Sequence, residues 1–271
     1  MMYYKYRPYS QRTLEILLNQ EIYFPSSEKL NDPLDSRIDI DAEYQKVVAS
    51  LDPTKDEATN RKAFLVYLLN AHDFRDPNTK QKIGLNQALQ RFIQTVGILS
   101  LSKTPTDPLL WSHYAASHTG ICLGFDIDKI QSESIFARDE VTYLAAPPYQ
   151  AIFLSLAEQL GEFMRPWDKQ SYPDELGDKF YTKQISELMR GNLFVKSEKW
   201  KYEEEYRIVQ SNPGMQGFPP EALQVVILGT KTTAQNSKTI ENILKIPGYS
   251  HVKFKRAMHI PGSFEFDIVD A

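Results

Sequence analysis

The stretch Ile121-Cys122-Leu123-Gly124-Phe125-Asp126 decides the fold class, because it is a short apolar run ended by a polar residue. Such a run is typical of a buried strand. Other strand patterns occur in groups, and groups of helical patterns separate them. This grouping favours an α+β fold with a mixed β-sheet core over a regularly alternating parallel fold. Strands are predicted at 3–7, 21–24, 97–103, 121–125, 140–144, 205–209, 225–228, 251–254 and 264–268.

Apolar residues at helical spacing mark the segments between these strands. Ser10 is the predicted N-cap of the first helix, and 108–114 is predicted as a short helix. Three helical patterns, at about 47–51, 64–69 and 85–93, fall in the region 40–95. Further helices are predicted at 152–163, 176–188 and 240–244. We expect a single domain, residues 1–271, with a helical insertion at about 40–95.

Composition narrows the functional classes. The 271 residues carry a formal net charge of −4, whereas a dedicated nucleic-acid coat protein is normally basic. The single cysteine, Cys122, excludes an internal disulfide and a site with several cysteine ligands. The chain lacks an apolar run of about 18 residues, and its first residues lack the apolar core of a secretory signal. We therefore expect a cytoplasmic protein.

The most informative segment is Trp200-Lys201-Tyr202-Glu203-Glu204-Glu205-Tyr206-Arg207-Ile208-Val209. On a strand, Glu203, Glu205 and Arg207 would share one face. Three successive carboxylates repel one another, so we expect at least one to have a partner. One interpretation is an edge strand with a charged solvent face. The other is a paired-carboxylate site, in which one glutamate stabilises a cation and the other handles an acceptor.

Two earlier strands also carry polar residues in alternation. Ser100 and Ser102 share one face of the strand at 97–103, either as small polar fillers or as part of a site. In the first strand, Tyr6 lies on the face opposite Arg7, and the simplest interpretation of Arg7 is a surface cation.

The segment Trp111-Ser112-His113-Tyr114 lies on the predicted short helix. Its aromatic rings either line a pocket that stacks on a flat ligand or belong to the core. Asn31-Asp32-Pro33 predicts an Asx-type turn. The chain has no glycine-rich phosphate loop and no H-E-x-x-H, so we do not expect a metal site.

The order of these pieces resembles the bacterial domain-of-unknown-function family numbered 2971, over roughly residues 3–210. The motifs that carry the resemblance are Tyr4-Lys5-Tyr6-Arg7, Leu30-Asn31-Asp32-Pro33-Leu34-Asp35, Ser100-Leu101-Ser102, Trp111-Ser112-His113-Tyr114, Gly120-Ile121-Cys122-Leu123-Gly124-Phe125, and Lys196, Trp200, Glu203, Glu205 and Arg207.

The chain also resembles, more distantly, the R-S-E arrangement of ADP-ribosyltransferases, which implies that fold and NAD as the substrate. By this resemblance, Arg7 contacts NAD and Ser100 and Ser102 brace the site. Glu205 is implied to be the catalytic residue, and Glu203 the acceptor-side residue. A threonine usual in the S-T-S motif is replaced here by a leucine between the two serines.

This second resemblance predicts further features. Tyr6, His113 and Tyr114 are expected to lie against the cofactor, with Tyr6 or Tyr114 stacking on a ring of NAD, and 196–202 is the expected acceptor loop. Arg7, Ser100 and Glu205 should converge in one concave site, without a metal ion. Such an enzyme would act as a toxin or an antiviral defence effector.

Two alternatives stay open. One is a non-catalytic module that binds a ligand or nucleic acid. The other is a metal-dependent nuclease with Glu203, Glu205 and Asp32 as ligands. The region 222–262 carries six cationic residues against one carboxylate, Glu241. That balance predicts either a surface for nucleic acid or a solvated face.

Overall fold

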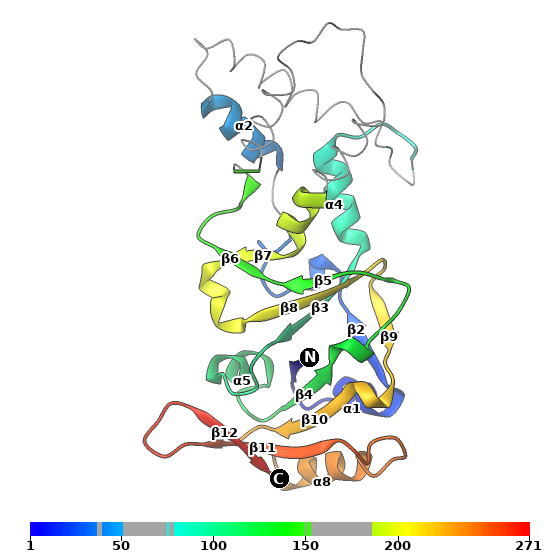
Figure 1. Cartoon of the computed structure of the whole chain (residues 1–271), viewed down its shortest axis with the longest axis vertical. Coiled ribbons are helices and arrows are strands. Elements are labelled where there is room, and N and C mark those ends of the chain that lie inside the picture. The colour runs from blue at the N-terminus through cyan, green and yellow to red at the C-terminus, as the bar shows by residue number, and fades with distance from the viewer. Residues whose placement is uncertain (37–39, 51–74, 76–78, 150, 153–185) are drawn as a thin grey trace, which may run out of the picture. The chain divides into compact units, whose positions relative to one another are not determined.

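The computed structural model describes residues 1–36, 40–50, 75, 79–149, 151–152 and 186–271 (Figure 1). The chain divides into two compact units, and each is described by itself. Unit 1 comprises Met1–Ser26, Val96–Val141 and Lys199–Ala271, and unit 2 comprises Ser27–Thr95 and Thr142–Glu198. Among the helices described, none is both long and apolar enough to cross a membrane.

Unit 1 is built on an eight-stranded mixed sheet with the order β12-β11-β10-β4-β1-β3-β8-β5 (Figure 1). Only β10 and β11 pair in parallel, and all other neighbours are antiparallel. The predicted α+β class with a mixed sheet is therefore confirmed. The strands are β1 Met2–Arg7, β3 Gly97–Ser102, β4 Ile121–Asp126, β5 Ile135–Glu140, β8 Glu205–Gln210, β10 Leu223–Leu228, β11 Lys253–His259 and β12 Phe266–Asp270.

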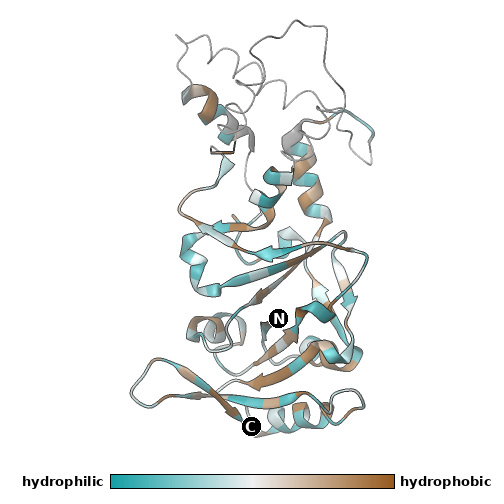
Figure 2. Cartoon of the chain, in the orientation of Figure 1, coloured by the Kyte–Doolittle hydropathy of each residue, from teal (hydrophilic) through white to brown (hydrophobic). Residues whose placement is uncertain are grey.

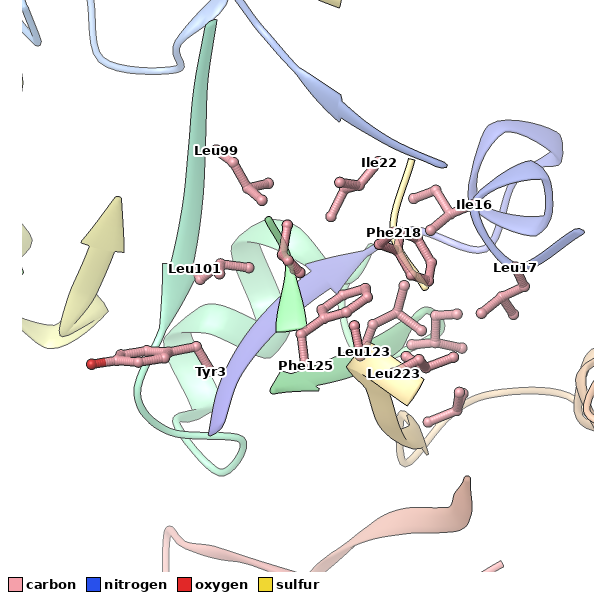
Figure 3. Packing of buried hydrophobic residues seen from close by; sticks show 14 of the residues in the cluster. Tyr3, Ile16, Leu17, Ile22, Leu99, Leu101, Leu123, Phe125, Phe218 and Leu223 are labelled. Atoms are coloured by element: carbon pink, nitrogen blue, oxygen red, sulfur yellow. The ribbon is translucent and has the colours of Figure 1, made fainter. Parts of the chain in front are cut away.

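Alternation along the strands gives this sheet two differently packed faces. One face, here called the α1 face, carries the larger core of unit 1, and helix α1 (Gln11–Asn19) and helix α8 (Ala234–Ile243) contribute to that core. A second two-stranded sheet, β2 (Glu21–Phe24) with β9 (Gly214–Gly217), also contributes through its β2 strand. Figure 3 shows how side chains from separate segments meet in this core, among them Tyr3, Ile16, Leu17, Ile22, Leu99, Leu101, Leu123, Phe125 and Phe218.

Local sequence explains why the covering helices begin where they do. Ser10 is the N-cap of α1, and its hydroxyl accepts a hydrogen bond from the Thr13 amide, as predicted. Thr233 caps α8 in the same way through the Asn236 amide. Figure 2 shows that β10 is mainly hydrophobic whereas β11 is mainly hydrophilic, which agrees with the deep burial of β10.

The opposite face, here called the α5 face, is packed by helix α5 (Pro108–Tyr114). Asp107 caps this helix by accepting hydrogen bonds from the amides of Leu109 and Leu110. The core of this face contains Tyr6, Cys122 and Trp111. Burial raises the pKa of the Cys122 thiol well above its usual value, so this cysteine is neutral.

Unit 2 contains α2 (Ile40–Ser50), α4 (Leu85–Thr95) and a parallel pair of short strands, β6 (Thr142–Leu144) and β7 (Val195–Ser197). A 3-10 turn, η1 (Ser27–Lys29), lies near its beginning, and residues 186–193 are helical. The predicted helices at 47–51 and 85–93 are confirmed by α2 and α4. Those predicted at 64–69, 152–163 and 176–188 lie wholly or mostly outside the described residues.

The strand predicted at 140–144 is wrong as a single element. The chain changes partner between two successive residues, because the Val141 amide donates to the Glu205 carbonyl and the Thr142 amide donates to the Phe194 carbonyl. β5 therefore ends at Glu140 and β6 begins at Thr142. The strand predicted at 251–254 begins two residues later and continues to His259.

Removing side-chain volume from the centre of the α1 face should destabilise the protein. Leu123 is fully buried in β4, so Leu123→Ala should lower the free energy of unfolding by about 2–5 kcal/mol. Leu18→Ala, at a residue that is 50% exposed, should change it by less than about 1 kcal/mol. Urea denaturation measures both, and equal losses would contradict the assignment of this core.

Candidate functional site

A polar patch lies on the α5 face, where β3 pairs with β8. Ser100 is directly opposite Arg207, and Ser102 is directly opposite Glu205. Residues opposite each other across an antiparallel pair share a face, so these four side chains form one group, here called the polar patch. In Figure 2 the first half of β8, which carries Glu205 and Arg207, is coloured hydrophilic.

Glu205 and Arg207 form a buried ion pair within one strand. Arg207 donates from Nε to Glu205 Oε1 at 2.7 Å and from its NH2 nitrogen to Oε2 at 3.1 Å. The two side chains are 4% and 0% exposed. A charged pair inside a protein needs this kind of matched, two-point geometry to offset its desolvation.

Glu203 reaches the α5 face in a different way. It lies at the end of a 3-10 helix, η3 (Glu198–Glu203), and β8 begins only at Glu205. Glu204 links the two with a φ of 42°, in the left-handed region, and its side chain is exposed. The expectation that Glu203 and Glu205 alternate along one strand is therefore wrong, because the chain turns between them.

Tyr114 connects Glu203 to helix α5. The tyrosine hydroxyl donates to Glu203 Oε1 at 2.5 Å, and Glu203 is 6% exposed. Burial raises the pKa of Tyr114, and the hydrogen bond to Glu203 raises it further. Tyr114 is thus a neutral donor that helps to satisfy a buried carboxylate.

Aromatic rings extend from this contact toward η3. The ring of His113 lies 6.2 Å from that of Tyr202, which in turn lies 6.1 Å from Trp200. His113 is exposed, whereas Trp111 is fully buried and donates from Nε1 to the Pro105 carbonyl. Of the two interpretations of this helix, the core interpretation is right for Trp111, and the exposed ring of His113 is accessible to a ligand.

Tyr6 also belongs to the packed part of the α5 face. Its ring makes an edge contact with Trp111 at 5.1 Å, and its hydroxyl donates to the Thr104 carbonyl. Burial raises the pKa of Tyr6. Tyr6 is 5% exposed, so its predicted stacking on a ligand ring would need these contacts to open.

Arg7 does not join the polar patch. Its partner across β1 and β4 is Ile121, which belongs to the core of the α1 face. The pKa of Arg7 is lowered by burial and, to a smaller extent, by the charge of Arg12 on helix α1. The predicted convergence therefore holds for Ser100 and Glu205 but not for Arg7, because β1 turns Arg7 to the opposite face of the sheet.

The edge-strand interpretation of the glutamate-rich segment is also wrong. β8 is an inner strand that pairs with β3 on one side and with β5 on the other. Glu203, Glu205 and Arg207 are all buried, so none of them forms a solvated face. The sequence pattern reflected a buried charge cluster rather than protection against sheet association.

Unit 2 contains a second cluster of charged residues that sequence reasoning missed. Lys196 on β7 lies 3.6 Å from a carboxylate oxygen of Asp35, and their side chains are 3% and 1% exposed. Asp32 makes the predicted Asx-type turn, since its Oδ1 accepts from the Leu34 amide. The sequence feature that could have indicated this cluster is the pair Asp32 and Asp35, three residues apart, but the segment was interpreted only as a turn.

The nuclease alternative stays an untested prediction. Across the described residues, no group of three or more His, Cys, Asp or Glu side chains is arranged to hold a metal ion.

Several lysines of the basic region at 222–262 form ion pairs with carboxylates in the structure, so the region has fewer unpaired positive charges than its sequence indicates. Lys238 and Lys245 both pair with Glu241, and Lys255 pairs with Asp270 on β12. Extending the window to the last residue adds three carboxylates, Glu265, Asp267 and Asp270. These pairs favour the solvated-face interpretation, and nucleic-acid binding stays an untested prediction.

Breaking the buried ion pair should cost far more stability than removing it whole. Glu205→Gln or Arg207→Met alone removes one partner of this buried ion pair, and breaking such a pair typically costs about 3–5 kcal/mol. The double variant should lose less than the sum of the two single losses. Urea denaturation gives the three values, with Glu204→Gln, at the exposed neighbour, as a control of unchanged stability. Additive losses would contradict the pairing.

Comparison with protein families gives a match over part of the chain. Residues 110–208, which run from helix α5 to β8, match the model of a family described as a protein of unknown function (DUF2971). No curated protein and no solved structure matches the chain. The match contains Trp111, Tyr114, Glu203, Glu205 and Arg207. The resemblance to this family is therefore confirmed over residues 110–208, which carry the acidic part of the candidate site.

Proposed function

We propose that the chain is an NAD-dependent ADP-ribosyltransferase-like enzyme whose reaction takes place at the polar patch. The observation that carries the proposal is the pairing of Ser102 with Glu205 and of Ser100 with Arg207 across β3 and β8. Two hydroxyls, a carboxylate and a guanidinium thus share one face. The serine strand β3 and the glutamate strand β8 are neighbours in the sheet.

The chemistry requires a fixed negative charge beside the ribose. Breaking the bond between nicotinamide and ribose C1′ sends the bonding electrons to nicotinamide and leaves an oxocarbenium-like cation. A carboxylate held ionised near the ribose 2′-hydroxyl stabilises that charge as it forms. The acceptor nucleophile then bonds to C1′ and gives up its proton.

Glu205 is suited to the stabilising role because two hydrogen bonds from Arg207 orient its carboxylate. Glu203, held by Tyr114, is the candidate for the proton of the acceptor. Because Glu205 and Arg207 are almost fully covered, NAD must displace the side chains above them to reach the carboxylate. The proposal therefore includes an opening of this face when NAD binds.

The cationic contact to NAD is assigned differently from the family pattern. Arg7 lies on the α1 face, so Arg207 is the arginine that this proposal gives to the site. A guanidinium can meet two oxygens of a pyrophosphate at once. His113 and Tyr202, whose rings lie 6.2 Å apart, are candidates for contact with a base or nicotinamide ring. A role as a toxin or defence effector rests on the resemblance alone.

Release of nicotinamide tests the proposal. The full chain is incubated with NAD, and free nicotinamide is measured by mass spectrometry, with calorimetry to measure NAD binding. We expect release by the wild type and a loss of about 10²- to 10³-fold in Glu205→Gln, because one fixed charge is removed from the transition state. If the wild type neither binds NAD nor releases nicotinamide, the proposal is wrong.

Two variants control for folding and for the choice of arginine. Glu204→Gln makes the same change in charge at the exposed neighbour and should keep wild-type release. Arg7→Met should also keep it, whereas the family pattern expects its loss. Circular dichroism must show that Glu205→Gln is folded, since this variant removes one partner of a buried ion pair. If Glu205→Gln is folded and releases nicotinamide at the wild-type rate, Glu205 has only a structural role.

A further inference from the structure

A small pocket in unit 2 combines apolar walls with buried charge. Its volume is about 230 Å³. The apolar lining comes from Leu34, from Leu144 to Pro147 at the end of β6, and from Val195 on β7. Asp32, Asp35 and Lys196 contribute the charges. The pocket is smaller than the roughly 300–1,000 Å³ of typical ligand sites, so it suits a single small group.

The charges in this pocket are not balanced. Lys196 is matched by Asp35 at 3.6 Å. Asp32 is 9% exposed, and only its Oδ1 is used, by the Leu34 amide at 2.9 Å. Its second oxygen, Oδ2, accepts no hydrogen bond from the part of the chain that the structure describes. Among the described residues that line the pocket there are two carboxylates and one cation, and the Asp32 carboxylate has an unused acceptor among them.

We propose that this pocket binds a protonated alkylamine, with the ammonium group on Asp32 and the alkyl stem against the apolar walls. An ammonium group donates to a carboxylate oxygen and cancels its charge, which makes the hydrogen bond stronger than a neutral one. The apolar lining favours a hydrocarbon stem. A small anion would meet an ammonium already matched by Asp35 and a second carboxylate, so it is disfavoured.

Three probes of equal stem length test the proposal without any substitution. Calorimetry on the full chain compares n-butylammonium, n-butanol and butyrate at the same salt concentration. We expect n-butylammonium to bind at least tenfold more tightly than n-butanol, and butyrate to give no measurable heat. Equal binding of the amine and the alcohol, stronger binding of butyrate, or no binding of the amine would overturn the proposal.

Variants then place the site. Asp32→Asn keeps an oxygen for the Leu34 amide but removes the charge, so amine binding should fall about 10- to 100-fold. Glu28→Gln makes the same change of charge at an exposed residue of unit 2 and should have no effect. Ala145→Trp, at an exposed lining residue, should reduce binding by filling the pocket. Wild-type affinity in both Asp32→Asn and Ala145→Trp would show that the amine binds elsewhere.

Discussion

Both faces of the eight-stranded sheet in unit 1 are packed, and this constraint governs the rest of the unit. The inner strands β3, β4, β8 and β10 are almost fully buried, so most of their side chains need an apolar neighbour or a polar partner. On the α1 face, Leu123 and its neighbours meet this condition by close packing. On the α5 face, Trp111 belongs to the core cluster that contains side chains of β1, β4 and β10.

Charged residues on an inner strand must meet the same condition by pairing. Glu205 and Arg207 lie two residues apart, so β8 presents them on one side and their groups reach each other within the strand. Glu203 receives the Tyr114 hydroxyl from helix α5. A buried ion pair is weak evidence for stability, because well-packed apolar side chains at the same positions often cost less. The proposed function gives these charges, which lie beside two serines, a chemical role.

Unit 2 satisfies the same rule less completely. Lys196 and Asp35 neutralise each other, but Asp32 keeps an acceptor oxygen without a partner among the described residues. A donor that reaches this oxygen would complete the hydrogen bonds of the carboxylate. Asp32 lines a pocket with room for such a donor. The proposed ligand, a protonated alkylamine, would supply it.

The sequence by itself determined most of the strands and helices of unit 1, because these depend on local patterns. The cap at Ser10 and the short helix at Pro108–Tyr114 follow from neighbouring residues, as do the apolar runs of β4 and β10. The sequence also placed Ser100, Ser102 and Glu205 among the candidate residues.

Only the tertiary structure decided which of them meet. Strand order made β8 an inner strand, β1 turned Arg7 away from the serines, and a turn at Glu204 removed Glu203 from the strand. The Lys196–Asp35 pair likewise joins residues more than 150 positions apart. Such contacts depend on strand pairing and register over long separations, which local periodicity does not encode.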